Sequence, residues 1–246
     1  MCTLAVAFQT DRRFPLVVAA NRDERLARPS ETWALRDLAS GARWAGPRDV
    51  EAGGTWIGVS AAGVFAGVTN FHSGQPPDRA RRSRGELVPL ALAHRTAASA
   101  RAALATLDAR AWNPFHLLVA DGHEAHLWRF DGESASLDAL GPGLHVVTES
   151  SADGRCPRGD LVRARWPLDS SPARLASLLA LHGPARETSV CVHLEGAPYG
   201  TRSSAILRLA GALDASELLV ADGPPCRVPF EDRTALLASL ARLASP

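Results

Sequence analysis

Lysine is absent from this chain of 246 residues, so all 27 of its Lys-plus-Arg positions are arginines. This absence excludes every activity that needs a lysine amine: Schiff-base and pyridoxal-phosphate chemistry, the lysine of a phosphate-binding loop, and a lysine general base. A GC-rich genome explains the bias. The 27 arginines nearly balance the 26 acidic residues, and the formal charge is +1. The basic excess that marks a nucleic-acid surface is therefore missing, and we expect no nucleic-acid partner.

Long apolar runs and clustered cysteines are missing too. No segment approaches the roughly 18 apolar residues of a membrane-spanning helix. The N-terminus lacks the charged region and long apolar stretch of a signal peptide. The four cysteines, Cys2, Cys156, Cys191 and Cys226, lie far apart in the sequence and form no CxxC pair, which argues against a zinc ribbon or a thioredoxin-like site. We expect a reduced, cytoplasmic protein with no membrane span and no metal site.

Short apolar runs predict strands arranged in pairs. We expect three hairpins, at Cys2–Phe8 with Leu16–Ala20, Thr55–Ser60 with Val64–Phe71, and Phe115–Ala120 with Ala125–Phe130. Further strands are expected at residues 144–148, 189–194, 203–210 and 217–221. Leucine and alanine at helical spacing predict helices over residues 86–107, 171–183 and 231–244. Because helices separate groups of strands rather than alternating with them, the pattern indicates an α+β fold in which helices cover antiparallel sheets. Without repeats or a convincing linker, we expect one domain over residues 1–246.

Cys2 stands directly behind Met1. Aminopeptidases commonly remove methionine before a small residue, which would leave Cys2 with both a thiol and a free α-amine. The reference pKa of that amine, about 7.7–8.0, allows it to accept the thiol proton while the sulfur attacks a carbonyl. A terminal amine that serves its own side chain as base is a known catalytic arrangement. The alternative is that Cys2 is only a small apolar residue at the start of a strand.

Three polar residues follow predicted strands. If the first two strands pair, residues near 20–23 lie across from residues near 2–4. A buried Arg22 there would hold the amine neutral and stabilise the thiolate, and Asp23 would orient the terminus. Asn70 closes the second hairpin, where its amide can donate to an oxyanion. The plainer alternatives are a solvated charged turn for Arg22 and Asp23, and an Asx turn for Asn70.

Other polar residues are weaker candidates. Arg202 precedes an apolar strand, close to Tyr199, the only tyrosine; it can bind a substrate carboxylate, brace the nucleophile or simply cap the strand. The basic segment Arg79–Glu86 leads into a helix and suits either anion binding or a solvated face. His123 and His126 are three residues apart on a strand, so they point to opposite faces and do not predict a metal site.

The motifs, taken in order, resemble the NRDE family, also called the transport and Golgi organisation protein 2 family. The similarity includes MC at the start, AANRDE, RP at Arg28-Pro29, GGTWIG, VTNF, SRGELV and YGTRSS. It is dense over the first 90 residues and returns near residues 199–207. The family resembles N-terminal-nucleophile hydrolases, which implies a four-layer αββα sandwich of two antiparallel sheets between helical layers.

The resemblance also implies roles for individual residues. Penicillin V acylases, bile-salt hydrolases and acid ceramidase, in the same superfamily, begin with cysteine. By similarity, Cys2 is the nucleophile and base, Arg22 and Asp23 are its bracing pair, Asn70 is the oxyanion donor, and Arg202 is the later arginine of the constellation.

One position departs from the family pattern. The family often shows LSN near the middle of the chain, where those acylases place a second functional Asn, whereas GLHVVTES puts Glu149 there. An ionised carboxylate cannot donate to an oxyanion, so Glu149 would instead recognise a cationic group, unless the alignment is shifted by one residue. Asn21, Trp56 and Tyr199 complete the expected substrate-binding set.

Two functions fit these residues. The first, which we favour, is a cysteine hydrolase that cleaves a C–N amide bond of a small acyl-amide or peptide-like substrate through an acyl-enzyme, without a cofactor. The second, implied by the resemblance to eukaryotic members, is a non-catalytic carrier of haem or lipid that uses the cleft between the sheets as an apolar pocket. There a Cys2 thiolate or a histidine would ligate haem iron. Neither the substrate nor the oligomeric state follows from the sequence.

Overall fold

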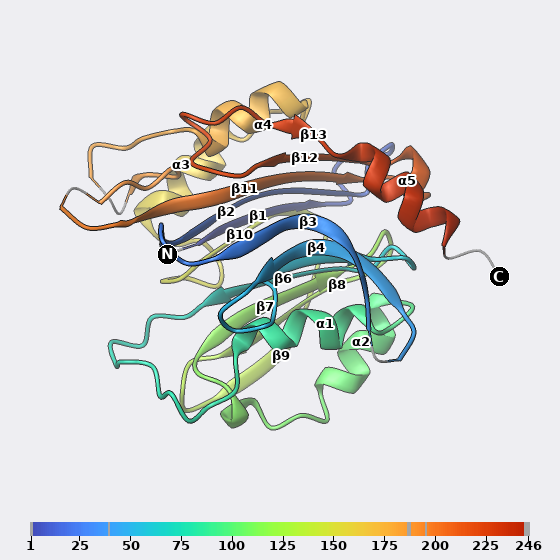
Figure 1. The fold of residues 1–246 in the computed structure, drawn as a ribbon, viewed down its shortest axis with the longest axis horizontal. Helices are drawn as coiled ribbons and strands as arrows, with labels where there is room; N and C mark the ends of the chain where they lie inside the picture. Colours follow the sequence, from blue (N-terminus) through green and yellow to red (C-terminus); the bar gives the residue numbers. More distant parts are fainter. Residues whose placement is uncertain (1, 39, 186–187, 195, 244–246) are drawn as a thin grey trace.

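The computed structural model describes residues 2–38, 40–185, 188–194 and 196–243. Its strands form two antiparallel sheets that lie face to face (Figure 1). The six-stranded sheet has the order β10-β1-β2-β11-β12-β13, with bounds Gly143–Thr148, Thr3–Phe8, Leu16–Arg25, Tyr199–Leu209, Glu217–Ala221 and Glu231–Asp232. The seven-stranded sheet runs in chain order from β3 to β9, with bounds Ser30–Asp37, Arg43–Asp49, Ile57–Ser60, Phe65–Asn70, Phe115–Ala120, Ala125–Phe130 and Ala135–Leu140.

Helices cover the outer faces of both sheets. The six-stranded sheet carries α3 (Pro157–Arg165) and α4 (Pro172–Leu179), at the top of Figure 1. The seven-stranded sheet carries α1 (Leu87–Leu92) and α2 (Ala97–Leu104), while α5 (Thr234–Arg242) packs against β12 and β4. Short 3-10 turns lie at Arg84–Glu86, Ala109–Ala111 and Leu213–Ala215. The expected αββα sandwich is confirmed. None of the helices in the described part of the chain is long and apolar enough to span a bilayer.

Apolar side chains fill the space between the sheets and the space under each helical layer. In β2, Val18 packs in the inter-sheet core and Val17 packs under α3 and α4, because alternate residues of a strand point to opposite faces. Both valines are fully buried, which explains why β2 begins with an unbroken apolar run. Each buried side chain of this size contributes about 1.5–3 kcal/mol to burial energy. These layers hold the strand ends, and hence the polar residues on them, in fixed positions.

Most predicted elements are present, with some corrections. The three hairpins are confirmed, and so are the strands β10, β11 and β12 and the helix α4. The single helix expected over residues 86–107 is instead two helices, because Thr96 ends the run and caps α2 by accepting a hydrogen bond from the Ser99 amide (3.1 Å). The helix expected over residues 231–244 is shorter: Glu231–Asp232 form β13, and α5 begins at Thr234. Its predicted last residue lies outside the described part of the chain.

The prediction of a strand over residues 189–194 is wrong. Its alternating apolar pattern is real, but its backbone bonds are local: the amides of Val190 and Cys191 both donate to the Leu181 carbonyl (3.1 and 2.9 Å). One isolated bridge, His193 to Gly200, connects this loop to β11. The segment is therefore a folded loop at the end of the six-stranded sheet.

Candidate active site

The ends of three neighbouring strands bring the candidate residues together. β1 and β2 pair so that Cys2, the residue before β1, lies beside Arg22. On the other side of β2, β11 places Thr201 opposite Asp23. A break in this register after Thr201 puts Arg202 in a β-bulge. The nucleophile candidate and its two expected partners therefore lie at one end of one sheet.

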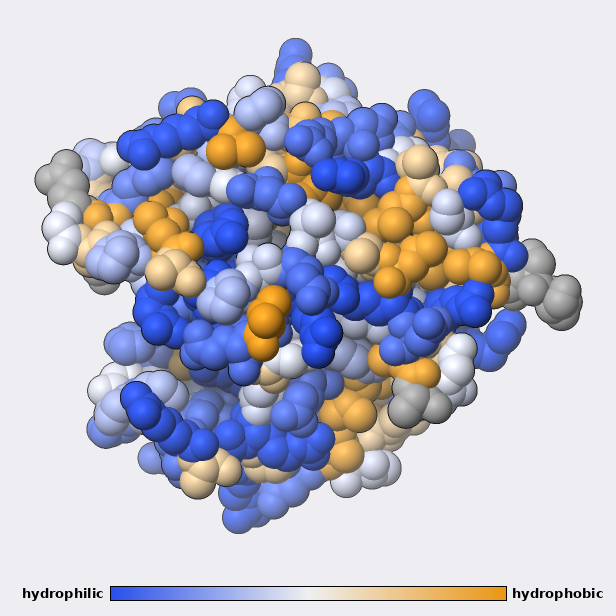
Figure 2. Space-filling view, viewed as in Figure 1, coloured by the Kyte–Doolittle hydropathy of each residue, from blue (hydrophilic) through white to orange (hydrophobic). Residues whose placement is uncertain are grey.

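A cleft of about 800 Å³ opens at these strand ends. Its lining includes Cys2, Arg22, Asp23, Trp56 and Asn70, so five of the predicted residues share one cavity. Much of the remaining lining is charged: Glu24, Arg25, Arg28, Asp49, Glu51, Asp78, Arg79, Arg81, Arg82 and Arg84. Hydrophilic residues also dominate the lower left of Figure 2, where Figure 1 places the loop that follows β6. The cleft therefore suits a polar or charged ligand.

The Cys2 thiol is half-buried and points at the backbone of Asp23. Its Sγ lies 3.9 Å from the Asp23 carbonyl oxygen, which also accepts a hydrogen bond from the Tyr199 hydroxyl (3.0 Å). Burial raises the pKa of the Cys2 thiol, and the charge of nearby Arg22 opposes this only in part. The sulfur is therefore protonated near neutral pH, and its use as a nucleophile requires a base.

The Asp23 carboxyl is fully buried at the same strand end. Its Oδ1 accepts a hydrogen bond from Thr201 Oγ1 (2.6 Å), and its Oδ2 lies 3.8 Å from Arg158 Nη1. Burial raises the pKa of Asp23 to about 7, with Thr201 and Arg158 lowering it and Glu149 raising it. Oδ2 has no hydrogen-bond partner among the described residues. Asp23 thus offers an acceptor atom that lies in ion-pair distance of Arg158 but accepts no hydrogen bond from the described residues, and its pKa is near neutrality.

Arg22 and Asp23 are held by different layers. Arg22 Nη2 contacts Asp49 Oδ2 (2.7 Å) in the opposite sheet, and Arg28 Nε binds the same oxygen (2.6 Å). Asp23 instead faces α3, because adjacent residues of a strand point to opposite sides. The two residues therefore anchor the strand end to both neighbouring layers rather than forming a pair with each other.

Arg158 and Glu149 form an ion pair that the sequence analysis missed. Arg158 lies on α3, its side chain is 1% exposed, and its Nη1 is 3.1 Å from Glu149 Oε2. This guanidinium balances the Glu149 charge that we expected to be available for a cationic substrate. Pro157 at the start of α3 is a helix-start signal, but nothing in the sequence distinguishes Arg158 from the exposed arginines around it.

Arg84 is a second residue missed as an individual candidate, although it belongs to the basic segment and to the SRGELV motif. It lines the cleft, and its Nη1 donates to the Pro114 carbonyl (3.1 Å). No carboxylate lies within ion-pair distance of it among the described residues. Burial lowers the pKa of Arg84, while Cys2 and Glu24 raise it. Arg84 is thus an available cation in the cleft that Cys2 also lines.

Two glycines explain how Arg84 reaches this position. A Cβ added to Gly54 would lie 2.5 Å from the Gly85 carbonyl carbon, so only glycine permits this approach of the two backbones. The Thr55 amide donates to the Gly85 carbonyl (3.0 Å). The GGTWIG and SRGELV motifs therefore pack directly against each other at the rim of the cleft.

Four predicted site residues, Asn21, Glu149, Tyr199 and Arg202, do not line the cleft. The Asn21 amide donates to the Leu179 and Val190 carbonyls (both 2.9 Å), and its oxygen accepts from Ser204; the side chain ties β2 to the loop after α4. Arg202 lies outside the lining residues. Tyr199, together with Asn70, Glu149 and Arg84, lines an adjoining hollow of about 950 Å³.

Comparison with known families shows which family the chain belongs to. The family model described as Transport and Golgi organisation 2 matches residues 1–167. The chain belongs to this family. The Homo sapiens protein named Transport and Golgi organization protein 2 homolog is 31% identical over 129 residues, which cover 49% of this chain and 45% of the relative. The Bos taurus homolog is 32% identical over 130 residues with the same coverage. The match thus spans just under half the length of these curated relatives.

Solved structures share the fold. Penicillin V acylase from Agrobacterium tumefaciens superimposes with a TM-score of 0.59 at 14% identity, covering 96% of this chain and 88% of that one. A variant of conjugated bile acid hydrolase from Clostridium perfringens gives 0.62 at 10% identity, covering 96% and 93%. A Caenorhabditis elegans ortholog of N-acylethanolamine-hydrolyzing acid amidase gives 0.57 at 14% identity, covering 83% and 92%. The family member described here therefore has the fold of N-terminal-nucleophile hydrolases.

Proposed function

We propose that this protein is an N-terminal cysteine hydrolase that cleaves a C–N amide bond. The observation that carries the proposal is the placement of the Cys2 thiol beside buried Asp23, at the mouth of a cleft that Arg22 and Asn70 also line. The fold of the acylases named above supports it. In this proposal, cleavage of the bond before Cys2 releases an α-amine next to the thiol.

The free amine supplies the base that the protonated thiol requires. The Cys2 thiol gives its proton to the amine, and Sγ bonds to the substrate carbonyl carbon. The Asn70 amide, which lines the cleft, donates to the resulting oxyanion. Collapse of this intermediate breaks the C–N bond, and the ammonium protonates the departing amine. Water then attacks the thioester carbonyl and gives a proton to the Cys2 amine. Collapse of the second intermediate breaks the C–S bond and releases the acid, and the ammonium returns its proton to the thiolate.

Asp23 positions the amine in this scheme. Its Oδ2 is the buried acceptor without a hydrogen-bond partner among the described residues, and an N–H of the Cys2 amine can donate to it. Such a bond directs the nitrogen lone pair toward Sγ. Thr201 fixes the other carboxylate oxygen at 2.6 Å and so sets the direction of Oδ2.

Arg84 indicates the class of substrate. It is a partly desolvated guanidinium without a carboxylate in ion-pair distance among the described residues, and it faces the same cleft as Cys2. A guanidinium binds carboxylate or phosphate in a planar, bidentate geometry. We therefore expect the amide substrate to carry an anionic group, as an N-acyl amino acid does.

The first experiment is the intact mass of the protein purified from its natural host. The proposal requires a mature chain that begins with Cys2. Iodoacetamide should then label Cys2 faster than Cys156, which is similarly half-buried and serves as the matched control. A host-purified chain that retains the bond before Cys2 contradicts the proposal.

The second experiment measures amine release from a panel of N-acyl amino acids and neutral N-acyl amines. We expect turnover by the processed wild type and by Cys156→Ala, with an acyl mass adduct on Cys2 early in the reaction. Cys2→Ala should show neither turnover nor adduct. Hydrolysis that survives in Cys2→Ala would exclude this residue as the nucleophile.

The carrier function remains an alternative hypothesis that no observation on the described residues favours. Core side chains such as Leu4, Phe65 and Leu118 fill the space between the sheets, and the cleft beside Cys2 has a charged lining. A haem titration addresses it directly: a Soret band that shifts in Cys2→Ala would support iron ligation by this residue.

A further inference from the structure

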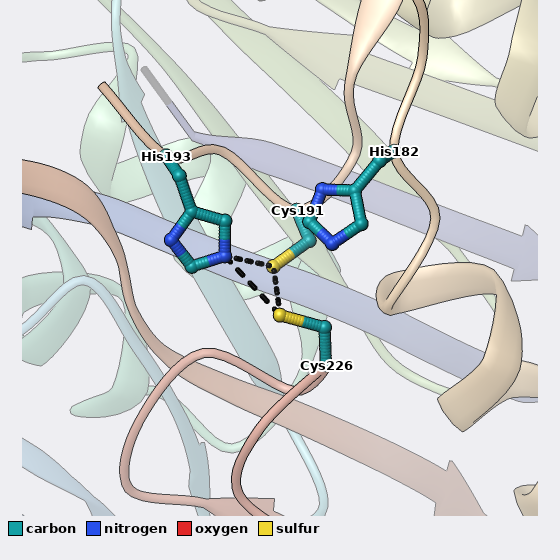
Figure 3. Close-up of side chains that lie close together, drawn as sticks. All are labelled: His182, Cys191, His193 and Cys226. Atoms are coloured by element: carbon teal, nitrogen blue, oxygen red, sulfur yellow. Dashed lines mark hydrogen bonds between the residues drawn. The ribbon is translucent and has the colours of Figure 1, made fainter. Parts of the chain in front are cut away.

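A second cluster of reactive side chains lies outside the cleft. His182, Cys191, His193 and Cys226 place one ligand atom each within 4.8 Å of all the others. His182, Cys191 and His193 belong to the loop between α4 and β11, and Cys226 belongs to the loop after β12. Figure 3 shows the two sulfurs and the two imidazole rings converging on one point from these separate loops.

The distances in this cluster are close to those of a tetrahedral metal site, two within its range and one slightly shorter. The two Sγ atoms are 3.6 Å apart, and His193 Nε2 is 3.6 Å from Cys191 Sγ and 3.1 Å from Cys226 Sγ. A zinc ion with Zn–S bonds of about 2.3 Å and Zn–N bonds of about 2.0–2.1 Å requires ligand–ligand distances of roughly 3.4–3.8 Å. The His182 ring completes the set, 5.3 Å from the His193 ring between centroids.

A disulfide explains this arrangement less well. A separation of 3.6 Å between Cys191 Sγ and Cys226 Sγ far exceeds an S–S bond of about 2.05 Å, and both cysteines are free. A disulfide would also give no role to the two imidazoles beside the sulfurs. The donor set itself, two thiolates and two neutral imidazoles, is the one that structural zinc sites use, and its two negative charges balance Zn²⁺.

We propose that these four residues bind one zinc ion in a closed, structural site. Four protein ligands fill a tetrahedral shell and leave no open position for a substrate, which distinguishes a structural site from a catalytic one. Cys191 is buried, whereas His182 and Cys226 are exposed, so the ion enters from the solvent side. Thiol deprotonation accompanies binding, and one proton leaves from each cysteine.

The zinc ion connects this site to the candidate active site through Val192. This residue lies between two of the ligands, its amide donates to Thr201 Oγ1 (2.8 Å), and its carbonyl accepts from the Thr201 amide (2.8 Å). Thr201 Oγ1 in turn donates to Asp23. Metal binding therefore fixes the loop that holds Thr201 against Asp23. The zinc proposal itself depends only on the four ligands and not on the hydrolase function.

Metal content of untagged, full-length protein tests the proposal. The protein is expressed with zinc, kept reduced and purified without chelators, and zinc per chain is measured by mass spectrometry. We expect about one zinc per chain for the wild type, as for a closed four-ligand site, and its loss in Cys226→Ser, whose altered side chain is exposed. Cys156→Ser, outside the cluster, is the matched control and should retain the metal.

Cobalt substitution provides a readout that does not depend on zinc supply. Titration of the metal-free wild type with Co²⁺ should produce the ligand-field bands of a tetrahedral site together with a thiolate charge-transfer band, and Cys226→Ser should lose them. A wild type that binds no zinc and gives no tetrahedral cobalt spectrum would overturn the proposal. So would a Cys191–Cys226 disulfide, seen as the loss of two hydrogens from the intact mass, that forms even with zinc present.

Discussion

Burial of the Asp23 carboxyl predicts a measurable cost in stability. The pKa of this group rises from 3.8 to about 7 in the folded state, primarily through burial. Between these two values the folded protein binds more protons than the unfolded one, so the free energy of unfolding falls as pH rises. A shift of about three pKa units corresponds to about 4 kcal/mol, which is fully lost only above pH 7 or so.

Asp23→Asn removes this titration and keeps an oxygen for the Thr201 hydroxyl. Relative to the variant, the wild type should lose about 1 kcal/mol by pH 4.5 and about 4 kcal/mol by pH 8. The difference in unfolding free energy between the two proteins should therefore change by about 3 kcal/mol over this range, in favour of the variant at high pH. We expect the same variant to lose amide hydrolysis, because an amide cannot replace the charged acceptor for the Cys2 amine.

Urea unfolding at a series of pH values measures this difference, and Asp49→Asn supplies a control of opposite sign. Burial of Asp49 raises its pKa, but hydrogen bonds from Arg28 and the Ala52 amide outweigh burial and hold the pKa below its usual value. Asp49→Asn should therefore be less stable than the wild type at neutral pH and approach it as pH falls. An Asp23→Asn difference that stays flat from pH 4.5 to 8 would refute the reasoning about burial.

Three further substitutions test the site. Asn70→Ala should lower kcat about 100-fold or more with little change in KM, as expected for an oxyanion donor; steady-state kinetics with an unchanged kcat would remove it from that role. Arg84→Gln should raise KM for N-acyl amino acids but not for neutral N-acyl amines, and equal effects on both would argue against anion binding. Arg158→Met should lower the free energy of unfolding in urea by about 3–5 kcal/mol, because it leaves the carboxylates of Asp23 and Glu149 without their guanidinium partner. Retention of wild-type stability would show that this pair contributes little.

Local patterns explain which elements were predictable. β7 and β8 have the predicted bounds because a clear Asp-Gly turn separates two apolar runs. β3 and β4 were missed because charged residues interrupt the apolar pattern of both segments, SETWALRD and RWAGPRD; β3 is also largely solvent-facing, and β4 contains a proline. The helix α3 was missed because PRGDLVRAR contains a glycine and little apolar periodicity. Half-exposed elements carry weak signals, whatever their importance for the site.

In the candidate site, too, local sequence motifs were predictable and long-range contacts were not. Cys2, Arg22 and Asn70 were predictable because family motifs mark them, and the structure brings them to one cleft. Contacts across layers were not predictable: Thr201 meets Asp23 across 178 positions of sequence. The proposed zinc ligands gave no spacing signal for a related reason, because Cys191 and Cys226 lie 35 residues apart on two loops. Long-range partners of this kind require the fold itself.

The order of strands has a consequence for synthesis on the ribosome. Residues 30–140 pair only with their neighbours in sequence, so a nascent chain can assemble the seven-stranded sheet early. β2, however, stays open along one side until β11 emerges and inserts beside it. The Thr201 hydroxyl therefore reaches Asp23 only at a late step, and a translation product that stops before residue 199 lacks the group that fixes this carboxyl.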